Sequence, residues 1–219
     1  MIKGVIFDID GVVLDSMWIW GDVMKRFLAR YSCEPDDDLM ERIVKMTFAQ
    51  SSEFIRDYYS IPREPEEILE EIFDVTREFY ENEIELKSGI ISFLEAFRER
   101  GMGIAAATAS DRSYIEAAFR RLGIMDYFDA IFTCRELDTA KTESLIYCKA
   151  AESLGLDKEE VVVFEDSLYA IRTLNKGGFK VAGVYDPHSS RDEEEIRLLS
   201  DIYLKNYDSF DLFSETFKL

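Results

Sequence analysis

From residue 90 onward, two patterns of apolar positions take turns along the chain. Apolar residues spaced three and four apart predict helices at about 89–100, 111–122, 142–154 and 167–176, and short apolar runs predict strands at 103–108, 130–133, 161–165 and 180–184. Two of these strands, 103–108 and 161–165, carry apolar residues on both faces, which is typical of parallel strands covered by helices on each side. The pattern predicts an α/β fold with a Rossmann-like, doubly wound and mainly parallel sheet.

Residues 15–87 interrupt this alternation, because they contain several helical patterns and no convincing strand. The clearest helix begins at Pro65, where a proline followed by two glutamates suits a first helical turn. We therefore expect two domains: an α/β core formed by residues 1–14 and 88–219, and an inserted α-helical domain formed by residues 15–87. The expected hinges are residues 11–16 and 87–89.

The charge balance restricts the class of partner. The chain has 219 residues, with 45 acidic against 26 basic side chains and a net charge of −19. Such a field repels nucleic acids and anionic membrane surfaces, so we expect neither as a partner. A small phosphorylated molecule is still compatible, because a metal ion and one lysine can reverse the potential inside a cleft.

The start of the chain, its longest apolar stretches and its cysteines bear on location and redox state. The first residues run directly into an expected strand without a signal-peptide pattern, and no stretch approaches 18 uninterrupted apolar residues. We expect a cytoplasmic protein, and the sequence leaves its oligomeric state open. The three cysteines, Cys33, Cys134 and Cys148, lie far apart without a metal-binding or redox spacing, and we expect them to be reduced thiols in the core.

The first candidate chemistry lies where the apolar run 5–7 ends in Asp8-Ile9-Asp10-Gly11. Side chains two residues apart on an extended strand point the same way, and neighbouring carboxylates resist ionisation unless a positive charge lies between them. A divalent metal is the simplest such charge, and an aspartate can also act as a covalent nucleophile. The alternative is an ordinary strand-to-loop junction, where Asp and Gly are common. A calcium loop is excluded, because apolar residues 12–14 follow.

Three further polar groups occur in order: Thr108-Ala109-Ser110 after one strand, Lys141 before a helix, and Glu165-Asp166-Ser167 after a later strand. Together with the segment Asp8-Ile9-Asp10-Gly11-Val12-Val13-Leu14-Asp15-Ser16, this order resembles the haloacid dehalogenase-like (HAD) phosphohydrolase superfamily. The resemblance is to its subfamily I, the branch of phosphoglycolate phosphatase and beta-phosphoglucomutase, in which a helical cap is inserted after the first strand. It covers nearly the whole chain and is strongest over residues 4–16 and 133–185.

The resemblance implies a role for each group. Asp8 would attack phosphorus and form an aspartyl-phosphate, and Asp10 would serve as the acid and base of the two half-reactions. The Thr108 hydroxyl and the Ala109 backbone amide would bind the phosphoryl oxygens. Lys141 would neutralise the nucleophile and the transferring group.

The resemblance also implies a magnesium ion bound by Asp8, the backbone carbonyl of Asp10, and Asp166, with Glu165 either a further ligand or a neighbour of the ligands. We expect Ser110 to cap the helix that follows it. Two structural alternatives stay open: the acidic pair at 165–166 caps the next helix, or Lys141 is a solvated surface residue.

The chain departs from the pattern of this branch in three loops. Ala140-Lys141-Thr142 stands where Gly-Lys-Pro is usual, no glycine follows Asp166 in the next helix, and Ser88-Gly89 stands where Pro-Gly is usual. None of these changes removes a reacting group.

The inserted domain would determine substrate specificity. Trp18, Phe48 and Gln50, together with Trp20, are candidates to contact the leaving group, although aromatic residues also serve as core packing. No histidine follows the first motif closely, and residues 47–52 contain no arginine to bind a second phosphate. The sugar-phosphate mutases of this branch are expected to carry both that histidine and such an arginine.

We therefore expect a magnesium-dependent phosphatase that hydrolyses a small phosphorylated metabolite. A sugar-phosphate mutase of the beta-phosphoglucomutase type is the alternative. A dehalogenase is disfavoured because Asp10 is present, and a phosphate-compound sensor without turnover is disfavoured because no catalytic group is missing.

Overall fold

The computed structural model describes residues 1–43 and 46–219, and these form two compact units. The first unit contains Met1–Met17 and Ile84–Leu219, and the second contains Trp18–Glu83.

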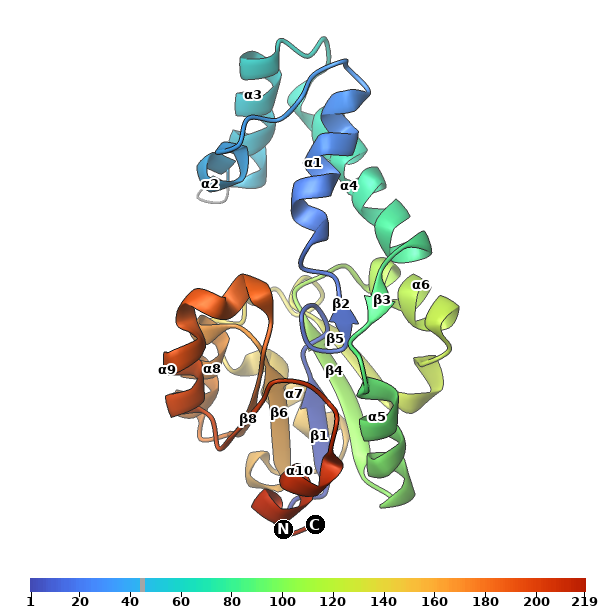
Figure 1. Ribbon diagram of the computed structural model, residues 1–219, viewed down its shortest axis with the longest axis vertical. Coiled ribbons are helices and arrows are strands. Elements are labelled where there is room, and N and C mark those ends of the chain that lie inside the picture. The colour runs from blue at the N-terminus through green and yellow to red at the C-terminus, as the bar shows by residue number, and fades with distance from the viewer. Residues whose placement is uncertain (44–45) are drawn as a thin grey trace. The chain divides into compact units, whose positions relative to one another are not determined.

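A parallel sheet forms the centre of the first unit (Figure 1), with the strand order β5-β4-β1-β6-β7-β8. Its strands are β1 (Gly4–Phe7), β4 (Gly103–Thr108), β5 (Ala130–Thr133), β6 (Val161–Glu165), β7 (Lys180–Val184) and β8 (Ile202–Leu204). The register places Phe7 of β1 beside Ala106 of β4 and Phe164 of β6. The chain segments that follow β1, β4 and β6 therefore leave the sheet at the same edge, where ligands collect in such folds.

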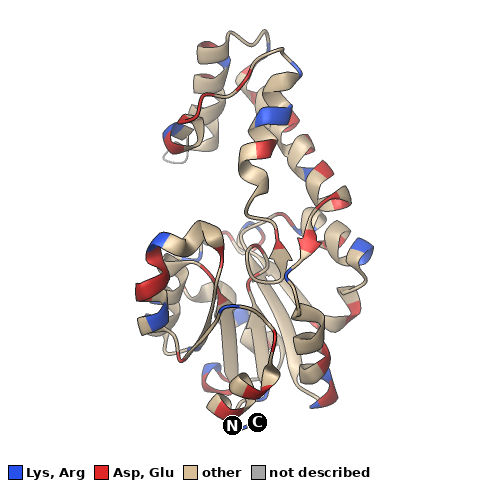
Figure 2. Ribbon diagram, in the orientation of Figure 1, with Lys and Arg blue, Asp and Glu red and all other residues tan. Residues whose placement is uncertain are grey.

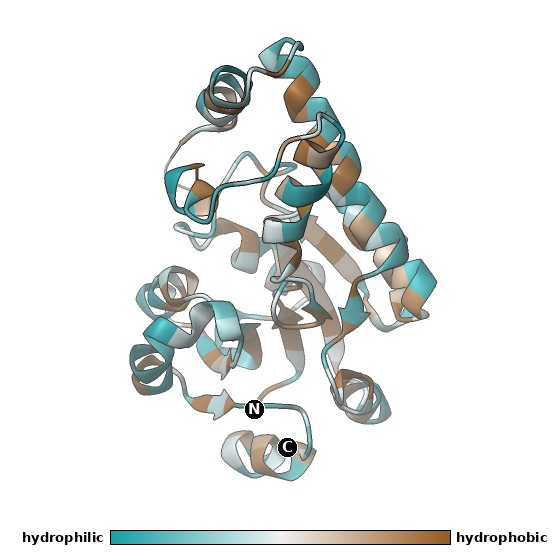
Figure 3. Cartoon of the chain, turned by 45° about the horizontal axis from the view of Figure 1, so that its top comes forward, coloured by the Kyte–Doolittle hydropathy of each residue, from teal (hydrophilic) through white to brown (hydrophobic). Residues whose placement is uncertain are grey.

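One face of this sheet packs on three helices, α7 (Leu145–Ser153), α8 (Leu168–Gly177) and α9 (Glu193–Leu199). Ile6, Ala105 and Val163 point to this face and share one buried cluster with Tyr147 of α7 and Leu174 of α8. In Figure 3 the strands are mainly brown, as expected for a sheet that is buried on both faces.

Residues of opposite parity on the same strands point to the other face. Phe7 and Phe164 stack there at 4.3 Å between ring centroids, and both contact Phe97. Phe213 stacks on Phe164, so an aromatic layer joins the strands to the helices. These are α5 (Ile90–Glu99) and α10 (Phe210–Phe217), and α6 (Arg112–Leu122) reaches the layer through Phe119 and Phe128. Helices on both faces confirm the predicted doubly wound α/β fold.

The four strands predicted beyond residue 90 have the expected bounds, and the helices differ by three residues or fewer at their starts. The expectation that 15–87 contains no strand is wrong at its borders. β2 (Leu14–Asp15) and β3 (Glu85–Leu86) form an antiparallel ribbon, with Leu14 opposite Leu86 and Asp15 opposite Glu85. Two-residue strands are too short to show a periodic pattern. The same holds for the three-residue β8, which was not predicted.

The described part of the second unit consists of the helices α1 (Ile19–Ala29), α2 (Leu39–Ile43), α3 (Phe48–Tyr59) and α4 (Pro65–Asn82). α4 begins at Pro65 as predicted, because the Glu67 carboxylate accepts the Glu64 N–H at 2.9 Å and closes a capping box. Ile68, Val75 and Phe79 form its buried stripe, and brown and teal segments alternate along the helix in Figure 3.

Acidic residues are spread over the helices of both units (Figure 2), and three glutamates fill the first turn of α9. Within the described ranges, no helix combines the length and apolar character needed to cross a membrane. The cysteines are free thiols, of which Cys134 is buried and Cys33 is half-buried. The expectation of a core thiol is wrong for Cys148, which lies exposed on α7.

Candidate active site

A tight turn follows β1 and presents the first motif. The Ile9 carbonyl accepts the N–H groups of Val13 and Leu14, both at 2.9 Å, so the chain folds back directly after Asp10. Gly11 adopts a φ of +77°, a conformation that glycine enters without strain. The Asp8 N–H donates to the Phe164 carbonyl at 2.9 Å, which fixes Asp8 against the end of β6.

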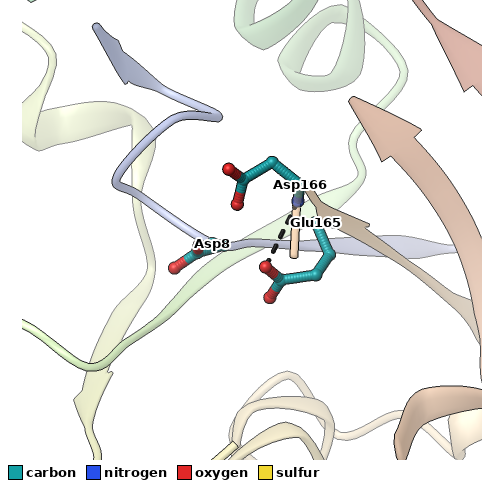
Figure 4. A group of neighbouring side chains, drawn as sticks. All are labelled: Asp8, Glu165 and Asp166. Carbon is teal, nitrogen blue, oxygen red and sulfur yellow. Dashed lines mark hydrogen bonds between the residues drawn. The ribbon is translucent and has the colours of Figure 1, made fainter. Parts of the chain in front are cut away.

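Three carboxylates meet at this edge of the sheet (Figure 4). Asp8, Glu165 and Asp166 each place one oxygen within 4.8 Å of the others, and all three are buried, with Asp8 at 5% exposure. Carboxylate oxygens are the ligands that Mg²⁺ prefers. The donor set therefore fits a magnesium ion.

The charges in the cluster also favour a cation. Burial, followed by the negative charge of Glu165, raises the pKa of Asp8 well above its usual range. The same two causes raise the pKa of Asp166 to about 8. Both carboxyl groups are thus harder to ionise than a free aspartate, whereas a bound divalent cation would favour the ionised forms that serve as nucleophile and ligand.

Lys141 supplies a positive charge inside the cluster. Its Nζ contacts Asp8 and lies 2.8 Å from Oε2 of Glu165, and the residue is 4% exposed. Burial lowers the pKa of Lys141, but the charges of Asp8 and Glu165 outweigh it and hold that pKa well above the ordinary value. The alternative of a solvated surface lysine is therefore wrong.

Both oxygens of Glu165 accept hydrogen bonds from the protein. Oε2 accepts from Lys141 and, at 3.0 Å, from the Tyr147 hydroxyl. Oε1 accepts from the Asp166 N–H, the bond dashed in Figure 4, and from the N–H and hydroxyl of Ser167. Burial raises the pKa of Glu165, but the positive charge of Lys141 and its hydrogen bond lower it by more, so the pKa lies below its ordinary value. Sequence reasoning missed Tyr147, whose only signal is that a buried tyrosine hydroxyl needs a partner.

Asp10 has partners of its own. The Ser16 hydroxyl donates to Oδ1 at 2.7 Å, and the Ser110 hydroxyl donates to Oδ2 at 2.6 Å. The expectation that Ser110 caps the next helix is wrong, because Asp111 caps α6 by accepting the Ser113 N–H at 2.9 Å. β1 ends at Phe7, so Asp8 and Asp10 do not share a strand face as the sequence suggested.

The expected phosphate-binding residues lie at the end of β4. Thr108 is fully buried, and its Oγ1 accepts the Ser110 N–H at 3.0 Å. Ala109, the next residue, is exposed. The first unit therefore gathers the groups expected from sequence to act on a phosphate: Asp8, Asp10, Thr108, Ala109, Lys141, Glu165 and Asp166.

The three specificity candidates belong to the second unit. Trp18 is 40% exposed and packs edge-on against Phe79, while Phe48 is 69% exposed and packs against Phe73. The side-chain oxygen of Gln50 accepts the N–H of residue 47 and closes the capping box of α3. The role of these three residues in specificity stays a prediction.

Gly11→Ala is expected to destabilise the protein more than Gly155→Ala. Both glycines have positive φ, +77° and +69°, so an alanine at either position costs about 1–2 kcal/mol of backbone strain. A Cβ at Gly11 would also lie 2.7 Å from Oδ2 of Asp166, whereas one at Gly155 meets nothing within 4 Å. Urea unfolding measures both costs, and the excess at Gly11 should shrink in an Asp166→Ala background. Equal costs for the two variants would contradict the contact.

Comparison with known proteins places the chain in a family. Residues 2–178 match the family model of the haloacid dehalogenase-like hydrolases. A phosphorylated carbohydrates phosphatase of Thermotoga maritima is 25% identical over 191 residues, which cover 87% of this chain and 88% of the relative. A fructose-1-phosphate phosphatase of Escherichia coli is 22% identical over 181 residues, covering 83% and 95% of the two chains.

Solved structures share the fold. The crystal structure of beta-phosphoglucomutase from Clostridium difficile superposes with a TM-score of 0.73 at 19% identity, covering 100% of this chain and 98% of that one. The match of the family model extends from β1 through α8, the segment that carries the acidic cluster and Lys141. This protein therefore belongs to the haloacid dehalogenase-like hydrolases.

Proposed function

We propose that this protein is a magnesium-dependent phosphatase that hydrolyses a small phosphomonoester through an aspartyl-phosphate on Asp8. The observation that carries the proposal is the buried contact of Lys141 with Asp8 and Glu165, beside Asp166, at the carboxyl edge of the sheet. Membership of a hydrolase family and similarity to named phosphatases support it.

The reaction would proceed in two displacements. The Asp8 carboxylate attacks phosphorus, the ester P–O bond breaks, and Asp10 gives its proton to the departing oxygen. Asp10 then takes a proton from water, which attacks the phosphorus of the aspartyl-phosphate, and inorganic phosphate leaves with Asp8 regenerated. The hydroxyls of Ser16 and Ser110 hold the Asp10 carboxyl in one orientation for both transfers.

Charge on the phosphoryl group would be balanced by the surrounding residues. The Thr108 hydroxyl and the Ala109 N–H, at the end of β4, would donate to phosphoryl oxygens, and Lys141 would offset negative charge on Asp8 and on the transferring group. The backbone of Thr108 is fixed by a hydrogen bond, because its carbonyl accepts the Cys134 N–H at 2.9 Å.

Asp8, Asp166 and the backbone carbonyl of Asp10 are the proposed ligands of the magnesium ion. When bound, the ion supplies positive charge that stabilises the transferring phosphoryl group. Glu165 is better suited to orient Lys141 and the Asp166 backbone than to act as a direct ligand, because its Oε2 is paired with the charged Lys141 and its Oε1 accepts two backbone N–H groups.

The second unit is proposed to act as the helical cap, with Trp18, Phe48 and Gln50 contacting the leaving group of the substrate. The acidic net charge of −19 argues for a small phosphorylated metabolite rather than a nucleic acid. We expect the enzyme to be cytoplasmic.

The test is phosphate release from a panel of sugar phosphates, polyol phosphates and phosphoglycolate, with Mg²⁺ and with excess chelator. We expect release from at least one compound, loss of that release on chelation and recovery when Mg²⁺ is restored. Inactivity on the whole panel, or release that persists in chelator, would contradict the proposal.

A sugar-phosphate mutase is the second candidate, supported by the structural similarity to beta-phosphoglucomutase. It would use the same nucleophile and return the phosphoryl group to a second hydroxyl. Residues 47–52 offer no arginine for a second phosphate, which favours the phosphatase. Product analysis separates the two, because a mutase yields an isomeric sugar phosphate and little free phosphate.

A further inference from the structure

The short 3-10 helix η3 (Pro187–Asp192) follows β7 and reaches the acidic cluster. The Ser189 hydroxyl donates to Oδ2 of Asp166 at 3.2 Å, and the Ser167 hydroxyl lies 3.3 Å from Oδ1 of the same carboxylate. Ser167 is the direct chain neighbour of Asp166, whereas Ser189 comes from a separate element. The orientation of Asp166 therefore depends on where η3 lies.

Asp186 fixes the start of η3. It is 1% exposed, its Oδ1 accepts the His188 N–H at 2.8 Å, and its backbone carbonyl accepts the Ser189 N–H at 3.1 Å. A buried carboxylate needs a charged partner, and Oδ2 has one in Lys87 at 2.7 Å. The ion pair between Lys87 and Asp186 thus holds the turn that carries Ser189.

Lys87 directly follows β3 of the ribbon that β2 and β3 form. Its N–H donates to the Val13 carbonyl at 2.9 Å, and its Nζ lies 3.8 Å from Asp15. One series of contacts consequently runs from this ribbon through Lys87, Asp186 and Ser189 to Asp166.

We infer that Ser189 is a positioning residue for the metal ligand Asp166, and that Lys87 and Asp186 act on the same ligand through it. The inference rests on the proposed function, because it takes Asp166 to bind the cation. Groups that hydrogen-bond a ligating carboxylate fix its orientation, and their removal lowers metal affinity about 10- to 100-fold.

Calorimetric titration of the substrate-free protein with Mg²⁺ tests the role of Ser189 without requiring turnover. We expect Ser189→Ala to raise the Mg²⁺ dissociation constant about 10-fold. Ser153→Ala is the matched control, because the Ser153 hydroxyl also donates a hydrogen bond, to the Ala150 carbonyl of its own helix, and its loss should leave the affinity unchanged. Equal affinities of Ser189→Ala and the unmodified protein would overturn the inference alone. Absence of Mg²⁺ binding by the unmodified protein would overturn it together with the proposed function.

The path through Lys87 is tested by combining substitutions. Lys87→Met alone leaves Asp186 buried without its partner, so Lys87→Met/Asp186→Asn serves as the variant that keeps the fold, verified by circular dichroism. We expect this pair to weaken Mg²⁺ binding in the unmodified background and to add less than a twofold further loss in the Ser189→Ala background. The same loss in both backgrounds, or no loss in either, would overturn the path.

Discussion

Asp8→Asn is expected to abolish phosphate release and to leave the protein folded. An amide cannot form the aspartyl-phosphate, so the rate should fall by at least about three orders of magnitude, as when other enzymes lose their nucleophile. The fold should persist, because the exchange preserves side-chain shape and removes negative charge from a cluster in which burial and the charge of Glu165 already disfavour the ionised form of Asp8. We expect the free energy of unfolding to change by less than about 2 kcal/mol.

Phosphate release on the substrate identified by the panel, together with urea unfolding, measures both effects. Asp126→Asn is the control for the chemical exchange, because Asp126 is exposed in the short 3-10 helix η1 (Met125–Tyr127). Activity that survives in Asp8→Asn would exclude the covalent route. Loss of the folded state in this variant would show that the carboxylate is needed for folding.

Lys141→Met is expected to remove both activity and much of the stability. The substitution leaves Asp8 and Glu165 buried without their cation, and breaking such a pair costs about 3–5 kcal/mol. Phosphate release should fall because the charge that offsets the transferring group is lost.

Two further variants separate these effects. Lys149→Met removes an exposed lysine paired with Glu152 and should change neither activity nor the unfolding midpoint. Lys141→Met/Glu165→Gln should recover stability, because the uncompensated charge is reduced, but it should not recover activity. An unfolding free energy for Lys141→Met equal to that of the unmodified protein would contradict the buried charge cluster.

Much of the site could be predicted from the sequence, because the carboxyl ends of parallel strands meet at one edge of their sheet. Asp8, Thr108 and Asp166 lie at the ends of three strands of one sheet, so the architecture predicts that they are close together. The register of β1 between β4 and β6 is the physical reason.

The partners of these residues could not be predicted, because they come from elements whose packing the local pattern does not encode. Tyr147 looks like one more apolar position of α7, and its hydroxyl meets Glu165 only after the helix packs on the sheet. Ser110 has the residue type of a helix cap, but Asp111 is an equally good cap and Asp10 competes for the serine hydroxyl. Ser189 lies in a short turn with no periodicity.

The ribbon of β2 and β3 makes the inserted helices a removable module. Because Leu14 pairs with Leu86 and Asp15 with Glu85, the two strands that flank the insertion lie about 5 Å apart, the spacing of neighbouring strands. A hairpin turn of two residues is enough to span that gap. We therefore expect that residues 18–83 can be exchanged for the insert of a relative, or replaced by a short turn. The strands that carry Asp8, Glu165 and Asp166 would stay connected as they are. With the roles proposed above for the two units, substrate range and phosphoryl chemistry could change independently during evolution.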